Sequence, residues 1–238
     1  MIAWTRKQVL EMDRPLVHIR AWERLPEIKF SAAQIIIHLG SWAPLLILIY
    51  GGFTNGLTVN PIQHLTFYTG DTAIRLLILS LACTPANTLF GFREAIKLRR
   101  PLGVYAAIYA AIHFGIFLFD YGFDPNLLYE AIFEKRYALI GFAALIILLP
   151  MALTSTKGWQ KRLGQNWKRL HQFVYLAGLL VVIHYAWLVK SDIRAPLIYG
   201  GIVVALLMAR IPAVRRIAAS ARGRVAHKLS NTGKEVRG

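Results

Sequence analysis

The chain has 238 residues, of which 56 % are hydrophobic and 17 % are charged, and its mean hydropathy is +0.46. Soluble domains carry about 25 % charged and about 45–50 % apolar residues, so this composition indicates a membrane protein. The net charge of +16 also suits a nucleic-acid-binding protein, so the positions of the charges must decide between the two. The single cysteine, Cys83, excludes an intrachain disulfide, a CxxC redox pair, an iron–sulfur cluster and a covalently attached c-type haem.

Residues 1–33 are charged and contain two prolines, and no apolar core follows a basic start. This pattern is not that of a signal peptide. We expect a cytoplasmic N-terminal extension, either a plain tail or an amphipathic stretch on the membrane surface.

Six apolar segments follow, each long enough to cross a hydrocarbon core of about 30 Å, which takes about 20 helical residues. They are 34–53, 72–91, 101–120, 137–155, 170–189 and 196–212. Backbone groups in lipid must be hydrogen-bonded within the protein, so each segment is predicted to be a helix. The expected fold is an all-α membrane protein: a bundle of six transmembrane helices over 34–212, followed by a basic cytoplasmic tail at 213–238.

The basic residues are divided unequally between the two sides of the predicted bundle. Most of the 28 lysines and arginines lie in the N-terminal segment, the second and fourth loops and the tail. The positive-inside rule therefore places both termini in the cytoplasm, and the net charge reports topology and not nucleic-acid binding. We find no internal repeat and no GxGxxG, GxxxxGK or HExxH motif, so the activity is expected in the membrane, among lipid.

Two histidines lie deep inside predicted spans. At 1.5 Å per residue, His113 lies about 18 Å and His184 about 21 Å from the inner ends of the third and fifth helices. An ionisable residue at such depth is costly without a partner, which makes both functional candidates. Two imidazoles at one level on two parallel helices are what a bis-histidine haem requires. A neutral imidazole that hydrogen-bonds between helices is the alternative for each.

His171 lies about 20 Å below His184 on the same helix, too far away to bind the same iron. Its open roles are ligation of a second, inner haem, binding of a quinone or flavin, and capping of the helix. His38, near the inner end of the first helix, is its one plausible histidine partner. The third helix carries Arg99 and Arg100 where an inner-haem ligand is expected, so the inner pair is incomplete. His64 is assigned to an external loop.

Four segments carry a resemblance to a known family. They are TSTKGWQKRLGQNWKRLHQFVYLAGLLVVIHYAWLVK, RRPLGVYAAIYAAIHFGIF around His113, HLTFYTGDTAIRLLILSLACTPA, and PLIYGG at the start of the sixth span. They resemble the MsrQ (formerly YedZ) family, the haem-binding membrane subunits of the periplasmic methionine-sulfoxide reductase system. That family belongs to the ferric-reductase-like transmembrane group, and the resemblance covers about residues 35–225.

The resemblance implies a function. Members of the family take electrons from the quinone pool or a cytosolic flavin reductase. They pass these electrons through haem b to the periplasmic molybdopterin subunit MsrP, which repairs oxidised methionines. The family's key histidines fall on His113, His171 and His184, with its first-helix histidine on His38. The resemblance further implies one or two haems b, bound FMN, and a place in the bacterial inner membrane.

Two other functions stay open. One is a stand-alone haem b reductase of the same fold that reduces metal ions or another acceptor directly. The other is a haem-free transporter or assembly factor that uses His113 and His184 for protons or metal ions. In the preferred interpretation the chain is an electron-transfer subunit and not the catalytic one.

Overall fold

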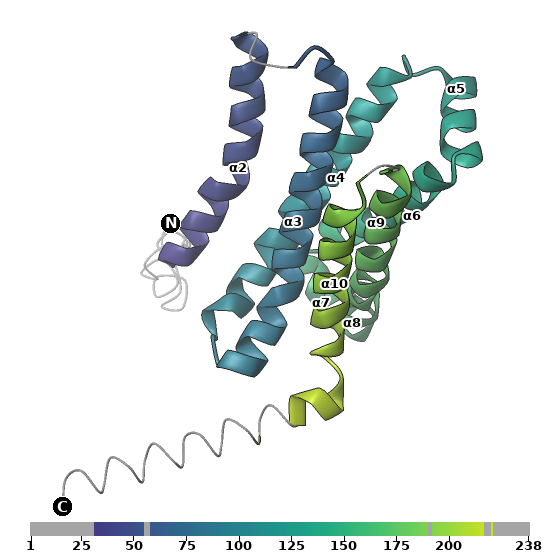
Figure 1. Cartoon of the computed structure of the whole chain (residues 1–238). Helices are drawn as coiled ribbons and strands as arrows, with labels where there is room; N and C mark the ends of the chain where they lie inside the picture. The colour runs from purple at the N-terminus through teal and green to yellow at the C-terminus, as the bar shows by residue number, and fades with distance from the viewer. Residues whose placement is uncertain (1–30, 55–57, 190–191, 217–219, 221–238) are drawn as a thin grey trace, which may run out of the picture. The chain divides into compact units, whose positions relative to one another are not determined.

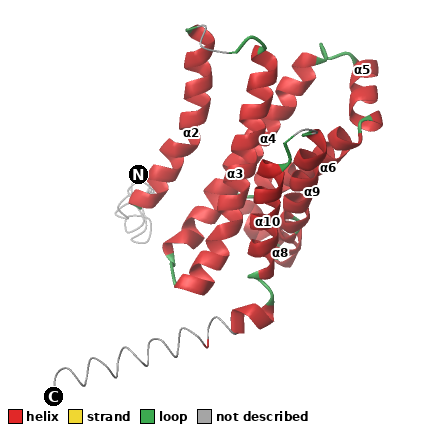
Figure 2. Cartoon of the chain, viewed as in Figure 1, coloured by secondary structure: helices red, strands yellow, loops and turns green. Residues whose placement is uncertain are grey.

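The computed structural model describes residues 31–54, 58–189, 192–216 and 220, and every regular element in these ranges is a helix (Figures 1 and 2). The helices are α2 (Ala32–Phe53), α3 (Pro61–Phe90), α4 (Glu94–Asp120), α5 (Pro125–Tyr129), the π-helix η2 (Glu130–Glu134), α6 (Arg136–Leu153), α7 (Lys157–Leu163), α8 (Gln165–Gln172), α9 (Val174–Leu188) and α10 (Arg194–Met208). The predictions for the N-terminal extension and for most of the tail fall outside the described residues.

Five stretches are long and apolar enough to cross a membrane: α2, α3, α4, α6 and the run Gln165–Leu188. The sixth predicted span corresponds to α10, a shorter apolar helix. The chain is thus an all-α membrane protein, as expected. The count of six spans and the orientation of the termini stay predictions.

The second span begins earlier than the sequence suggested. Helix α3 starts at Pro61 and not at 72, because Pro61 occupies its first turn and the Asn60 side chain accepts a hydrogen bond from Gln63 N at 3.2 Å. The assignment of His64 to an external loop was therefore wrong, since His64 lies in the first turns of this helix. Asp71 also becomes part of a membrane helix.

Two further boundaries were wrong. Helix α4 starts at Glu94 and contains Pro101, so most of the basic residues assigned to the second loop lie on the helix itself. The predicted fifth span is divided near Phe173 into α8 and α9, and much of the predicted fourth loop is helical. A helix continues past the hydrocarbon core where its charged turns reach water, and hydropathy alone does not register those turns.

The helices pack mainly as two antiparallel pairs, α3 with α4 and α6 with α9. Helix α10 contacts α9 and α3, and α2 contacts α4. Small and apolar side chains fill the centre, among them the fully buried Leu81, Ala106 and Ala177. Small residues let membrane helices approach closely, which is the main source of packing energy in lipid.

Helix α2 is joined to α4 beside a proline. Pro44 lies inside α2, next to Leu45 and three residues after Ser41. The Tyr109 hydroxyl lies between Leu45 and Ser41: it accepts from Leu45 N at 3.1 Å and donates to Ser41 O at 2.7 Å. Proline and inserted side chains are the usual causes of interruptions in a helix. The buried Tyr109 therefore satisfies two backbone groups of a neighbouring helix.

At a second proline, a side chain from another part of the chain again bonds a backbone group of the helix. Pro85 in α3 has no N–H, so it offers no helical partner to the carbonyl of Leu81 four residues earlier. The Arg210 guanidinium, just beyond α10, donates to that carbonyl through Nη2 at 2.6 Å, and its Nη1 donates to Tyr175 Oη at 2.7 Å. Arg210, a charge inside the predicted sixth span, therefore ties α10 to α3 and α9.

We expect Tyr109→Phe to lower the free energy of unfolding by about 1–3 kcal/mol, because it removes the partner of two buried backbone groups. The measurement is unfolding of the purified protein by titration of sodium dodecyl sulfate into detergent micelles. Tyr50→Phe is the control, since Tyr50 lies on α2, the helix to which Tyr109 bonds, and is 70 % exposed. Equal stability of the two variants would show that the inserted hydroxyl contributes nothing.

Candidate functional site

His113 of α4 and His184 of α9 meet inside the bundle. Their ring centres are 6.2 Å apart and their planes make an angle of 81°. The shared level predicted from helical rise is therefore present in the structure. Both side chains are partly exposed. The pair brings together the two antiparallel helix pairs, one histidine from each.

Each imidazole is oriented by a hydrogen bond between its Nδ1 and a backbone carbonyl of the adjacent helix. His113 Nδ1 lies 2.9 Å from Thr66 O of α3, and His184 Nδ1 lies 2.7 Å from Tyr137 O of α6. A carbonyl oxygen only accepts, so Nδ1 carries the proton in both rings. Nε2 is left as the basic nitrogen, which is how metal-binding histidines are commonly oriented.

A glycine lies against each ring. A Cβ atom on Gly70 would be 3.1 Å from His113 Nδ1, and one on Gly141 would be 2.7 Å from His184 Nδ1. Gly70 lies one helical turn after Thr66, and Gly141 lies one turn after Tyr137. Each histidine therefore fits into a notch formed by a glycine and the carbonyl one turn before it.

The two notches are repeats of one arrangement. The histidine and its carbonyl acceptor are 47 residues apart in both cases. Each consists of a carbonyl, a glycine one helical turn later and a histidine. The absence of an internal repeat in the sequence stays a prediction.

The donor set limits which metal group fits between the rings. No cluster of three or more His, Cys, Asp or Glu side chains that could hold a metal ion occurs among the described residues. Two imidazoles alone suit a metal that brings its own in-plane ligands, as haem iron does. With metal–imidazole bonds of about 2.0 Å and ring nitrogens about 1.1 Å from the ring centres, two axial imidazoles have centres about 6 Å apart. The observed 6.2 Å fits haem.

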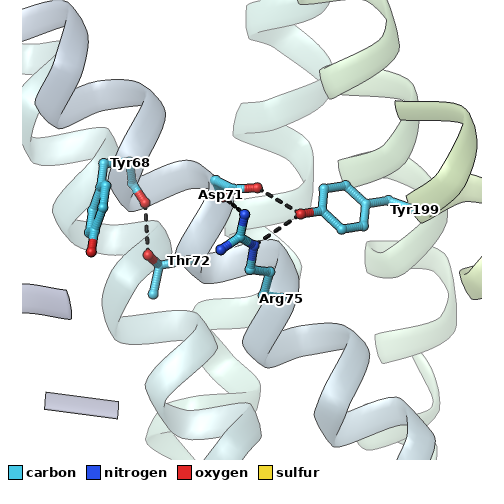
Figure 3. A network of polar contacts seen from close by, with 5 residues as sticks. All are labelled: Tyr68, Asp71, Thr72, Arg75 and Tyr199. Atoms are coloured by element: carbon cyan, nitrogen blue, oxygen red, sulfur yellow. Dashed lines mark hydrogen bonds and ion pairs between the residues drawn. The ribbon is translucent and has the colours of Figure 1, made fainter. Parts of the chain in front are cut away.

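An ion pair lies in α3 immediately after Gly70 (Figure 3). Arg75 Nη2 is 2.6 Å from Asp71 Oδ2, and the Tyr199 hydroxyl of α10 joins both residues. This hydroxyl accepts from Arg75 Nε at 3.0 Å and donates to Asp71 Oδ1 at 2.9 Å. The ring of Tyr199 lies 6.1 Å from that of Tyr185, the neighbour of His184. Charges inside a span are kept by such pairing.

This network was not predicted. Arg75 lies within the predicted span 72–91, but Asp71 falls just before that span begins, so no ion pair was expected. Their spacing of one helical turn, with opposite charges, was the available signal once α3 was known to start at Pro61.

The other two candidate histidines have separate surroundings. His171 of α8 stacks on Trp167 with ring centres 3.9 Å apart, and its Nδ1 is 3.0 Å from the Trp167 carbonyl. Its Nε2 is buried without a hydrogen-bond partner of good geometry in the described part of the chain. His38 of α2 contacts Tyr105 of α4, with His38 Nδ1 2.9 Å from Tyr105 Oη. The structure therefore gives each histidine its own partner, and ligation of an inner haem by His38 and His171 stays a prediction.

Known proteins are similar to this chain in sequence. The model of the family described as "Ferric reductase like transmembrane component" matches residues 69–182, from α3 into α9. A "Protein-methionine-sulfoxide reductase heme-binding subunit MsrQ" of Xanthomonas euvesicatoria is 40 % identical over 187 residues, which are 76 % of this chain and 86 % of the relative. The protein of that name from Deinococcus radiodurans is 42 % identical over 77 % of this chain and 92 % of its own length. The chain belongs to the MsrQ family. No solved structure matches the chain. Membership in this family agrees with the apolar helices in making the chain a multi-pass membrane protein.

We expect Gly141→Ala to destabilise the protein by about 1–3 kcal/mol, because the new Cβ must displace the His184 ring from the Tyr137 carbonyl. Gly115→Ala is the matched control, since no atom lies within 4 Å of a Cβ at that position of α4. The control is expected to be neutral or to gain about 0.5–1 kcal/mol from the better helix former. Detergent unfolding curves measure both, and equal stability of the two variants would contradict a tight notch.

Proposed function

We propose that this chain is the haem b-binding, electron-transferring membrane subunit of a methionine-sulfoxide reductase system in a bacterial inner membrane. The observation that carries the proposal is the pair His113 and His184, whose ring centres are 6.2 Å apart and whose Nδ1 atoms each bond a carbonyl, which leaves Nε2 as the basic nitrogen. The curated names of the MsrQ relatives, which call them heme-binding subunits, support it independently.

The chain's own residues bind and orient the cofactor. Haem iron, when bound, supplies one-electron redox chemistry. His113 and His184 would hold the haem iron through Nε2, and the carbonyls of Thr66 and Tyr137 would increase the basicity of these rings through Nδ1. The surrounding apolar helices keep water from the site, which is a further control on the reduction potential.

The level of the pair supports delivery to the outer side. His113 lies about 10 Å from the Asp120 end of α4, which the charge pattern places outside. We propose that the acceptor is the periplasmic molybdopterin subunit MsrP, which repairs methionine sulfoxide in periplasmic proteins. The quinone pool or a cytosolic flavin reductase is the proposed electron donor at the other end.

His171 is proposed as a second cofactor position at the inner end of the bundle. Its buried Nε2 supports a role in ligating a second haem or in binding a quinone or flavin. His38, which contacts Tyr105, is the less supported ligand. Bound FMN remains part of the proposal by family resemblance, without assigned residues.

We expect His113→Ala and His184→Ala each to remove the low-spin haem of the purified protein, because a six-coordinate iron needs both rings. The measurements are the haem-to-polypeptide ratio and the reduced-minus-oxidised spectrum. His64→Ala is the control and should keep both values, since His64 lies near the outer end of α3. A full wild-type spectrum in both of the first two variants would exclude these ligands.

The two other functions differ from the proposed one in their need for the partner. Without MsrP, reduced wild-type protein in membranes should be reoxidised slowly, whether or not ferric chelates are present. Adding MsrP and oxidised methionine should make its reoxidation fast. Rapid reoxidation by ferric chelates without MsrP would favour a stand-alone reductase. Purified protein that takes up no haem on reconstitution would favour a transporter or assembly factor.

A further inference from the structure

A pocket of about 530 Å³ lies between α2 and α4, at the end of the bundle away from the histidine pair. It is lined by Gln34, His38, Trp42, Lys97, Arg100, Pro101, Val104, Tyr105 and Ile108. Its volume is in the range of small-molecule sites in proteins. Neither His113 nor His184 lines this pocket.

The pocket changes in character along its length. Lys97 and Arg100 form one end, and Ile108, about 16 Å further along α4, forms the other. The apolar end is open sideways, since Trp42 is 50 % and Ile108 is 41 % exposed. In a membrane these side chains face acyl chains. A pocket with cations at one end and apolar walls at the other fits an amphiphile with an anionic head.

Internal contacts hold the walls of the pocket in place. The Tyr105 ring makes edge contacts with His38 at 5.6 Å and with Trp42 at 6.2 Å between ring centres. One turn further along α4, Tyr109 is inserted into the backbone of α2. The separation of α2 and α4 is therefore set by bonds within the protein, and the space between them is preformed.

The cationic end keeps capacity for a ligand. Lys97 Nζ is paired with Glu94 Oε1 at 2.7 Å, but both side chains are about half exposed and an ammonium has three donors. Arg100 is exposed and adds a planar guanidinium that suits phosphate.

The charge pattern assigns this end of α4 to the cytoplasmic side, where anionic lipid headgroups attract basic residues.

We propose that this pocket binds an anionic phospholipid of the inner leaflet, with its phosphate between Lys97 and Arg100 and an acyl chain along Trp42 and Ile108. Basic pockets between transmembrane helices on the cytoplasmic side recognise such headgroups. A neutral headgroup, such as that of a quinone, supplies no counter-charge to Arg100 and leaves Lys97 with Glu94 alone. The proposal concerns a different surface from the histidine pair and does not depend on haem.

The test is native mass spectrometry of the full-length, haem-loaded protein in detergent, with phosphatidylglycerol or phosphatidylcholine added. We expect the wild type to retain phosphatidylglycerol in preference to phosphatidylcholine. Lys97→Gln/Arg100→Gln should reduce the phosphatidylglycerol-bound fraction about tenfold, since each basic residue contributes to headgroup binding. Ile108→Trp, which fills the apolar end and keeps both cations, should reduce it as well.

The matched control is Lys157→Gln/Lys161→Gln, which removes two exposed cations of α7, the helix between α6 and α8. It should bind phosphatidylglycerol as the wild type does. Equal loss in the two double variants would overturn the proposal in favour of diffuse charge attraction. No loss in the pocket variants would overturn it too, as would pocket-dependent binding of a quinone or of flavin mononucleotide in place of the phospholipid. Haem content is measured on the same samples. Loss of haem would count against the proposed function, whereas loss of phosphatidylglycerol binding alone would count only against the lipid pocket.

Discussion

The hydrocarbon core contains no water to satisfy a polar group, and most of the specific contacts in this protein follow from that constraint. The Tyr109 hydroxyl hydrogen-bonds two backbone groups of α2 beside Pro44, and the Arg210 guanidinium donates to the Leu81 carbonyl, which Pro85 leaves without a helical donor. Asp71 and Arg75 neutralise each other across one turn of α3. The histidine pair is one more instance, because each Nδ1 finds a carbonyl on the adjacent helix. In each ring a single nitrogen then remains for chemistry.

This arrangement explains why the site is built from two similar helix pairs. A single imidazole in lipid would be a liability, whereas two related notches bring two basic nitrogens to one place from opposite sides. The glycines are required because a β-carbon would occupy the space of the ring, as the 2.7 Å approach at Gly141 shows. Helix α4 has a role at both ends: His113 serves the proposed electron-transfer site, and Lys97 with Arg100 serves the proposed lipid pocket.

Much of this was predictable from the sequence, for physical reasons that also explain the failures. Hydropathy identified the apolar part of every span, because burial in lipid requires it, and helical rise placed His113 and His184 at one level. The charged turns outside the core escaped the same criterion, so α3 and α4 were begun too late and Asp71 was assigned to a loop. The Nδ1 acceptors were not predictable, because backbone carbonyls leave no trace in residue type. The contact of His38 with Tyr105 was also not predictable, and the inner partner of His171 stays a prediction.

Ligation of one iron by both His113 and His184 is tested most directly by the electron paramagnetic resonance spectrum of the purified ferric protein. Two axial imidazoles whose planes are 81° apart predict a low-spin signal of the highly anisotropic kind given by nearly perpendicular rings. A high-spin ferric signal, or a protein that holds no haem after reconstitution, would contradict coordination by the pair.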